Sequence, residues 1–219
     1  MSVVFKVIDE KYADNFITGK SIRLGTLYDF RDIEKHSKGI SDPNEGVAKS
    51  YISETNNLES YEKALVRQDF KNLGLFSGPD VDLHFTNCNI IQNYPNCFIF
   101  CSCMEMPDIK SFNGTIAYES GYNAVLRIND IRALSEMLAV ALQRAGKSDG
   151  GYFGAPVSYL DSEWDYLEKG IKPPNPFEKH IAFQGQDEHR VIFNSYSNDI
   201  NASIADFEPF PANLVERVN

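Results

Sequence analysis

The sequence predicts an α+β fold in one domain that spans residues 1–219. Segments typical of strands and of helices follow one another without the regular strand–helix alternation of a doubly wound parallel sheet. A chain of 219 residues suffices for one domain, and no stretch rich in proline, serine or glycine divides it. Its 42% hydrophobic and 24% charged residues are ordinary for a soluble globular protein.

The first half of the chain predicts strands around a short helix and a long loop. In order, we expect a strand over 3–8, a helix over 10–18, a strand over 21–27, a loop over 35–50, a helix over 51–73 and a strand over 96–104. Tyr12, Phe16 and Ile17 are expected on the core side of the first helix, and Gly19 stops it. Glycines and Pro43 mark the loop. The apolar run 97–101 is typical of a strand that is covered on both faces.

The second half begins with a strand over 123–128 and the clearest helix of the chain. Apolar residues recur there at helical spacing, namely Ile131, Leu134, Leu138 and Leu142, with Asn129 as the expected N-cap and Gly146 as the end. A strand is expected over 155–160. Three prolines make the segment 171–177 an extended connection, because proline fits neither a central strand nor a helix interior. The last strands are expected over 181–184 and 188–196.

The net charge, the N-terminal sequence and the cysteine spacing limit the classes of protein that we expect. The 31 acidic and 21 basic residues give a net charge of −10, which disfavours tight nonspecific binding to nucleic acid but leaves room for a local basic groove. The beginning, MSVVFKVIDEKY, holds no apolar signal core, and no apolar run reaches membrane-spanning length. The cysteines, at 88, 97, 101 and 103, lack paired Cys-x-x-Cys spacing. We therefore expect a cytoplasmic protein without membrane association, with buried reduced thiols rather than a metal site.

The most informative stretch is Gln186-Asp187-Glu188, which opens the last expected strand. Alternation along a strand places Gln186, Glu188 and Arg190 on one face, with Val191 and Phe193 on the other. A carboxylate beside an amide and a guanidinium is costly in a core and useful in a cleft. Two interpretations follow: a functional site, or an edge strand whose solvated face carries an ordinary Glu–Arg pair.

Three further groups of residues are candidates for a site. Arg23 lies in a short expected strand that also contains Gly25, which lets a ligand approach the backbone closely. Arg23 therefore either binds a phosphate or carboxylate or is an ordinary surface-facing strand residue. Tyr28 and Phe30, followed by Arg31 and Glu34, present a ring to a planar ligand or pack in the core. Ser102 is the hydroxyl of an apolar strand and needs a hydrogen-bond partner, either a carboxylate or nearby backbone. The four histidines show no ligand spacing, and no nucleophile elbow, Walker loop or dinucleotide glycine motif is present.

Together these residues resemble the Arg–Ser–Glu arrangement of the ADP-ribosyltransferase superfamily. An early basic residue is followed by a middle strand with a core serine and by a late Gln-x-Glu that opens a strand. The N-terminal pattern, FKV over 5–7, a helix, and IRLGTLYDFR over 22–31, is similar to that of bacterial toxin-like enzymes. Nearest in kind are the CmdT-like transferases of toxin–antitoxin and phage-defence systems, which modify RNA. The resemblance implies a split, mixed β-sheet core with flanking helices.

The resemblance also implies a role for each residue. Cleavage of the nicotinamide–ribose bond of NAD⁺ develops positive charge on the ribose, and a carboxylate beneath it stabilises that charge. Glu188 would take this role, Ser102 would orient it, and Gln186 would face the acceptor. Tyr28 or Phe30 would stack on nicotinamide.

This chain departs from the superfamily pattern in two places. The superfamily's arginine usually lies in the first strand, where this chain has Lys6, and its Ser-Thr-Ser strand is Cys101-Ser102-Cys103 here. Either Lys6 or Arg23 would therefore hold the diphosphate, with Arg31 also on the cofactor side.

The resulting hypothesis is a cytoplasmic NAD⁺-dependent ADP-ribosyltransferase, a toxin or defence effector. RNA or another nucleic acid is the expected acceptor and an antitoxin protein an expected partner; modification of a protein and hydrolysis of NAD⁺ are the alternatives. The rival class is a non-enzymatic protein-interaction module in which Glu188 and Arg190 form a structural ion pair. The loop 35–50 is expected to become ordered on NAD⁺ binding and to bring Asp42 or Glu45 toward the acceptor, unless it is a static turn.

Overall fold

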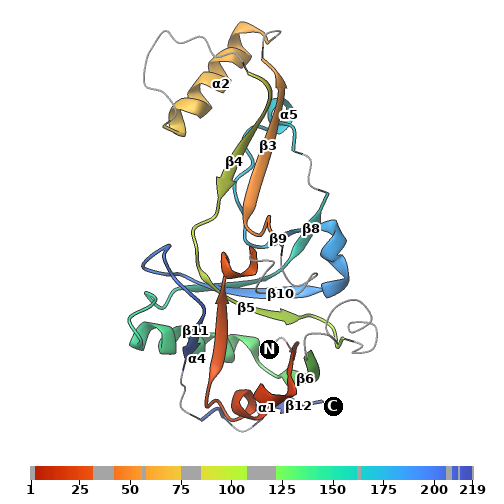
Figure 1. The fold of residues 1–219 in the computed structure, drawn as a ribbon, viewed down its shortest axis with the longest axis vertical. Coiled ribbons are helices and arrows are strands. Elements are labelled where there is room, and N and C mark those ends of the chain that lie inside the picture. Colours follow the sequence, from red (N-terminus) through yellow and green to blue (C-terminus); the bar gives the residue numbers. More distant parts are fainter. Residues whose placement is uncertain are drawn as a thin grey trace. The chain divides into compact units, whose positions relative to one another are not determined.

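The computed structural model describes residues 3–31, 42–55, 58–74, 85–107, 122–161, 164–205, 209–211 and 213–218. It has the predicted α+β class, with a multi-stranded antiparallel sheet and a few helices (Figure 1). The chain divides into two compact units, where the sequence predicted one domain. Unit 1 comprises Met1–Gly46, Pro95–Leu160 and Pro176–Asn219, and unit 2 comprises Val47–Tyr94 and Asp161–Asn175. Because unit 2 is assembled from two separate stretches, its boundaries carry no linker composition that sequence reading detects.

The main sheet of unit 1 is organised around one central strand, β5. Its strands are β1 (Val4–Asp9), β2 (Ile22–Thr26), β5 (Phe98–Cys103), β6 (Tyr122–Ile128), β7 (Tyr152–Pro156), β10 (Glu188–Phe193), β11 (Ser203–Ala205) and β12 (Val215–Arg217). One edge of β5 pairs with β10 along its whole length. The other edge is shared: Ile99 pairs with Gly25 of β2, and Cys103 pairs with Phe5 of β1. The sheet therefore forks at β5.

Two amphipathic helices cover one face of this sheet. α1 (Glu10–Ile17) and α4 (Ile131–Arg144) contribute their apolar sides to the main hydrophobic core, together with Phe98, Phe100 and Val191 from the sheet. The expectation that Tyr12 of α1 faces the core is wrong, since this side chain is 54% exposed. The predicted N-cap of the second helix is wrong by one residue. Asp130 is the cap, because its carboxylate accepts the backbone N–H groups of Arg132 and Ala133.

Unit 2 is a two-stranded ribbon packed against a helix. β3 (Val47–Glu54) and β4 (Thr86–Asn93) pair antiparallel, and α2 (Ser60–Asn72) and α5 (Tyr166–Lys169) complete the unit. Its small core gathers Ile52, Val66, Phe70, Ile90 and Tyr166. The predicted loop over 35–50 is wrong at its end, since residues 47–50 begin β3; residues 35–41 lie outside the described chain. The predicted helix over 51–73 is wrong at its start, and β4 was not predicted.

The segments around the candidate site also differ from the prediction. Residues 181–184 belong to a 3₁₀-helix, η3 (Ile181–Gln186), rather than a strand. The expected strand over 155–160 is divided between β7 and β8 (Ser158–Leu160), and β8 pairs in parallel with β9 (Glu178–His180). β10 ends at Phe193 rather than at Tyr196. It is buried along its length between β5 and β7, which excludes the interpretation of an edge strand with a solvated face. Within the described chain no helix is long and apolar enough to cross a membrane.

Candidate functional site

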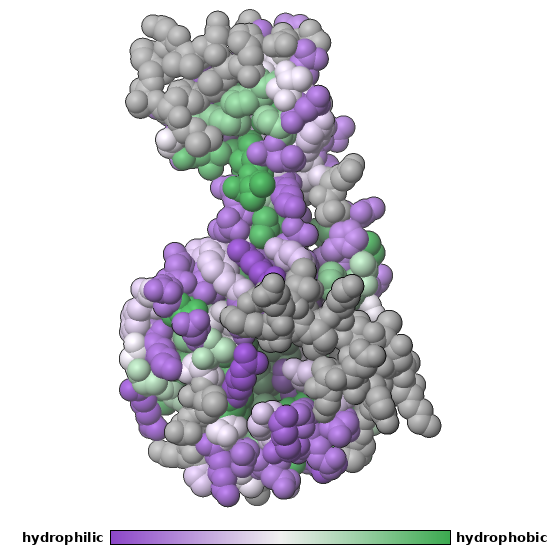
Figure 2. All heavy atoms as spheres, viewed as in Figure 1, coloured by the Kyte–Doolittle hydropathy of each residue, from purple (hydrophilic) through white to green (hydrophobic). Residues whose placement is uncertain are grey.

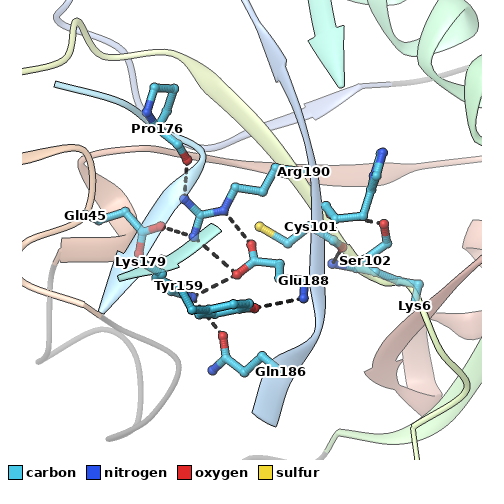
Figure 3. Close-up of polar contacts among 11 residues, drawn as sticks. Lys6, Glu45, Cys101, Ser102, Tyr159, Pro176, Lys179, Gln186, Glu188 and Arg190 are labelled. Atoms are coloured by element: carbon cyan, nitrogen blue, oxygen red, sulfur yellow. Dashed lines mark hydrogen bonds and ion pairs between the residues drawn. The ribbon is translucent and has the colours of Figure 1, made fainter. Parts of the chain in front are cut away.

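Glu188 and Arg190 stand at the centre of a buried cluster of charged side chains (Figure 3). Their side chains share one face of β10, as strand alternation predicts. Arg190 Nε lies 2.6 Å from Glu188 Oε1, and Arg190 Nη2 lies 3.2 Å from Glu188 Oε2. The pair is bidentate, which is the strong form of an arginine–carboxylate contact.

Lys179 of β9 supplies the second cation and links Glu188 to Gln186. Its Nζ donates to Gln186 Oε1 at 2.8 Å and to Glu188 Oε2 at 2.9 Å. Gln186 ends η3, and Asp187 then adopts a left-handed conformation with a φ of 40° before β10 begins. This turn brings the amide of Gln186 onto the same ammonium group that contacts Glu188.

Three further groups complete the cluster from segments distant in sequence. The guanidinium of Arg190 forms an ion pair with Glu45 and donates to the backbone oxygen of Pro176. The backbone N–H of Glu188 donates to the hydroxyl oxygen of Tyr159 at 2.9 Å. Glu188 is 6% exposed, Arg190 1% and Glu45 1%. Ion pairs this buried need their partners, because removing one leaves an uncompensated charge.

The charges of the cluster set the protonation of its members. Burial alone would raise the pKa of Glu188, but Arg190 and Lys179 outweigh it and hold this pKa well below its ordinary value. Burial likewise opposes the charged forms of Arg190 and Lys179, yet Glu188 and Glu45 raise the pKa of both. The pKa of Glu45 is raised, because burial dominates over its attraction to Arg190. Glu188 is therefore the carboxylate that the site keeps ionised.

Strand register places Arg23 on the same sheet face as Glu188. Cys101 is opposite Arg190, so the two share a face, and Ile99 lies two residues before Cys101 on that face. Gly25 pairs with Ile99, and Arg23 is two residues before Gly25. Arg23 is more than half exposed and its Nη2 lies 3.0 Å from Asp29 Oδ2.

Lys6 and Ser102 lie on the opposite face, which the helices cover. Phe5 is the residue of β1 that faces Cys103, so Lys6 points the other way, with its Nζ 5.0 Å from the centre of the Phe100 ring. This Nζ donates to the backbone oxygen of Cys101 at 2.7 Å. Cys101 lies in β5 between Ile99, which pairs with β2, and Cys103, which pairs with β1. The Ser102 hydroxyl donates to the backbone oxygen of His189 at 3.2 Å. The expected contact of Ser102 with Glu188 is thus wrong, and the backbone alternative is correct.

The thiol of Cys101 takes the place expected for the serine hydroxyl. It lies on the face of Glu188, and burial together with the Glu188 charge raises its pKa, so it remains neutral. Sequence reasoning assigned this position to Ser102 because a hydroxyl is the more familiar partner of a carboxylate. The signal that distinguishes the two is register, since Cys101 faces Arg190 across the strands and Ser102 faces His189.

The aromatic residues expected on the cofactor side lie around the turn η1 (Asp29–Arg31). The guanidinium of Arg31 lies 4.2 Å from the centre of the half-exposed Tyr28 ring, and its Nε donates to the backbone oxygen of Glu45 at 2.7 Å. Arg31 thereby ties Tyr28 to the segment that carries Glu45. The ring of Phe30 lies over Gly25, where a Cβ would be only 2.8 Å from its nearest carbon, so this position requires glycine.

The arrangement combines an ionised carboxylate with basic and aromatic side chains. It brings together Glu188, Gln186 and Arg190, which the sequence grouped, and adds Lys179, Tyr159 and Cys101, which it did not assign to the site. Glu45, expected only on the acceptor side, is paired with Arg190 instead. Asp42 and Glu45 are both buried. Their expected approach to an acceptor on NAD⁺ binding stays a prediction. Among the described residues, no group of three or more histidine, cysteine and acidic side chains is placed to hold a metal ion.

Comparisons of the chain with models of protein families, with characterised proteins and with solved structures found no match.

Proposed function

We propose that the protein is an NAD⁺-dependent ADP-ribosyltransferase in which Glu188 stabilises the positive charge that develops on the ribose. The observation that carries this proposal is the contact of the Glu188 carboxylate with Arg190 and Lys179 at the start of a central strand, which favours its ionised form. A preorganised negative charge of this kind lowers the activation barrier for cleavage of the nicotinamide–ribose bond. Gln186 shares the ammonium group of Lys179 and lies next to the carboxylate, as the acceptor side requires.

The forked sheet supports the ADP-ribosyltransferase-like architecture within this proposal. The strand of the expected basic residue, β1, the strand with the core serine, β5, and the strand of the carboxylate, β10, are neighbours in that order. The divergence of β1 and β2 along one edge of β5 fits a split sheet, whereas the pairings described within this sheet are antiparallel rather than mixed. The parallel pair β8–β9 delivers Lys179 beside this core.

Arg23, rather than Lys6, is the proposed ligand of the NAD⁺ diphosphate. Arg23 lies on the face of Glu188 and is exposed, whereas Lys6 lies on the helix-covered face and is engaged with Cys101. A guanidinium offers several N–H donors to ionised phosphate oxygens. Asp29 accepts a hydrogen bond from this guanidinium and would share it with the diphosphate. Tyr28, Phe30 and Arg31 would line the nicotinamide and ribose side.

RNA or another nucleic acid is the proposed acceptor, and a toxin or defence effector with an antitoxin partner in the cytoplasm is the proposed setting. This part rests on the resemblance of the N-terminal pattern. The net charge of −10 requires that nucleic acid be held by a local group of basic residues. Protein modification and hydrolysis of NAD⁺ without an acceptor are the alternative forms of the same chemistry.

Release of nicotinamide from labelled NAD⁺ by the purified chain tests the proposal. The reaction is run alone, with total RNA and with a protein extract, and transfer of label from the adenosine half identifies the acceptor. We expect nicotinamide release that depends on Glu188. Absence of release under all three conditions, from protein whose circular dichroism shows it folded, would remove the enzymatic assignment.

The second candidate is a non-enzymatic protein-interaction module that uses the same scaffold. It is favoured by the burial of Glu188 and by the engagement of both of its carboxylate oxygens with Arg190 and Lys179. In that case the cluster specifies the packing of loops on the sheet. Its signature is an unaltered NAD⁺ pool together with a large loss of stability when the cluster is changed.

A further inference from the structure

Asp187, which follows Gln186 in the chain, uses its backbone N–H, its backbone oxygen and its carboxylate to join two segments of unit 1. Its N–H donates to the backbone oxygen of Gln184 in η3 at 3.2 Å. Its backbone oxygen accepts from the N–H of Met104 at 2.8 Å, and its Oδ2 accepts from the N–H of Glu105 at 3.0 Å. One residue therefore ties the 3₁₀-helix that carries Gln186 to the chain at the end of β5.

The backbone of Asp187 has a conformation that few residue types favour. Its φ of 40° and ψ of 53° lie in the left-handed region. Glycine enters this region freely, and aspartate and asparagine tolerate it because their short polar side chains form local hydrogen bonds. Of these three residue types, only aspartate and asparagine carry an oxygen that can accept the N–H of Glu105. The position therefore needs both a backbone tolerance and a side-chain acceptor.

An exposed aspartate is by itself ordinary on this chain. The sequence has 31 acidic residues, and Figure 2 shows hydrophilic residues spread over the visible surface of unit 1. The position of Asp187 sets it apart, because the residues before and after it, Gln186 and Glu188, both contact the ammonium group of Lys179 (Figure 3). A change in this turn would therefore move an amide and a carboxylate that share one cation.

The contacts of Asp187 also extend the pairing of β5 with β10. Cys103, the last residue of β5, is opposite Glu188, the first residue of β10. The next two amides along the chain, those of Met104 and Glu105, both bond to Asp187. Strand ends open when few hydrogen bonds hold them. These two bonds therefore hold the start of β10 and the backbone from which Glu188 projects.

We propose that Asp187 is a positioning residue, which holds Gln186 and Glu188 in the placement that cleavage of the nicotinamide–ribose bond requires. This role rests on the proposed function, because the reaction is that of Glu188. Misplacement of a catalytic group by about 1 Å lowers a rate by a factor on the order of 10². Release of the turn should therefore lower kcat. The KM for NAD⁺ should change little, since Arg23 and Tyr28, the proposed cofactor ligands, belong to other segments.

Three replacements of Asp187 separate its side chain from its backbone conformation. Asp187→Asn keeps an acceptor oxygen and the tolerance of a left-handed backbone, Asp187→Gly keeps the tolerance alone, and Asp187→Ala keeps neither. The measurement is nicotinamide release from labelled NAD⁺ by the full chain. We expect Asp187→Ala to lower kcat by roughly 10- to 100-fold with KM little changed, Asp187→Gly to lower it less, and Asp187→Asn to recover most of it.

Asn213→Ala is the matched control, because Asn213 is also exposed and left-handed, with a φ of 68°. Asn213 precedes β12, and β6, β1 and β5 lie between β12 and β10. The control should lower the melting temperature about as much as Asp187→Ala, on the order of a few degrees, without lowering kcat. Full kcat in Asp187→Ala or in Asp187→Gly would overturn the proposal, as would an equal loss of kcat in Asn213→Ala.

Hydrogen exchange tests the contacts of Asp187 without NAD⁺. The amides of Met104 and Glu105 should exchange faster in Asp187→Ala than in the unmodified chain, and at the unmodified rate in Asn213→Ala. Unchanged exchange in Asp187→Ala would overturn the positioning role even if the chain cleaves NAD⁺. Absence of nicotinamide release from the unmodified chain would instead overturn the proposed function, and the positioning role with it.

Discussion

The ammonium nitrogen of Lys179 lies 2.9 Å from Oε2 of Glu188, and both side chains are buried. The same nitrogen contacts Gln186, so one cation holds the two polar residues that the sequence singles out. With Arg190 on its other side, Glu188 stays ionised where an isolated carboxylate would take up a proton. This relationship is the basis for the first two predictions.

Glu188→Gln should abolish NAD⁺ cleavage by the proposed enzyme, lowering the rate by a factor on the order of 10²–10³. It should also lower the free energy of unfolding by roughly 3–5 kcal/mol, because Lys179 and Arg190 lose their shared carboxylate. Nicotinamide release and urea unfolding are measured on the same preparation. Full activity in the folded variant would exclude Glu188 from the chemistry.

Glu45→Gln is the matched variant for this experiment. It removes the other carboxylate paired with Arg190 while leaving Lys179 and Glu188 together. We expect a clear loss of stability with NAD⁺ cleavage retained in the fraction that is folded. Equal loss of activity in both variants would mean that the integrity of the cluster, rather than the charge of Glu188, controls the reaction.

Arg23→Ala should weaken NAD⁺ binding, because the exposed guanidinium on the face of Glu188 is the proposed diphosphate ligand. Lys6→Ala should leave the affinity unchanged and instead lower stability, since the Cys101 carbonyl at the fork of the sheet loses its donor. Isothermal titration calorimetry and thermal unfolding separate the two effects. The reverse pattern would move the diphosphate to the helix-covered face.

Ser102→Ala should have little effect on NAD⁺ cleavage. The lost hydrogen bond to the backbone of His189 should cost about 1 kcal/mol of stability. Cys101→Val, by contrast, replaces a polar neighbour of the Glu188 carboxylate by an apolar one and should lower the rate as well as the stability. A large rate effect at Ser102 and none at Cys101 would contradict the assignment of faces.

Stability should fall as the solution is acidified, in two stages. Burial lowers the pKa of His189 in the folded chain, so below its ordinary value of 6.5 the unfolded chain takes up a proton that the folded chain does not. The depressed pKa of Glu188 adds a second loss below about pH 4.5, its ordinary value. Urea unfolding from pH 8 to pH 3 measures both. His189→Gln should remove the first stage and keep the second; an unchanged profile would mean that His189 does not titrate on unfolding.

The sequence by itself determined the elements whose patterns are local. The apolar run around Phe98–Cys103, the helical spacing from Ile131 to Leu142 and the polar Gln186-x-Glu188 opening of a strand each depend on neighbouring residues, and each was located within a few positions. Pairing of Glu188 with Arg190 followed from strand alternation alone. Even the choice of α+β class required no more than the order of these segments.

Only the tertiary structure decided which distant residues join Glu188 and which face of the sheet each occupies. Glu45, Tyr159 and Lys179 lie in segments with no periodic signal, and strand register together with the turns before β3 and β10 brings them to one place. Register also separated Ser102 from Cys101, neighbours in sequence that point to opposite faces. Because a shift of one residue exchanges the two faces, the residue of β5 that faces Glu188 is set by long-range pairing and cannot be read from β10 alone.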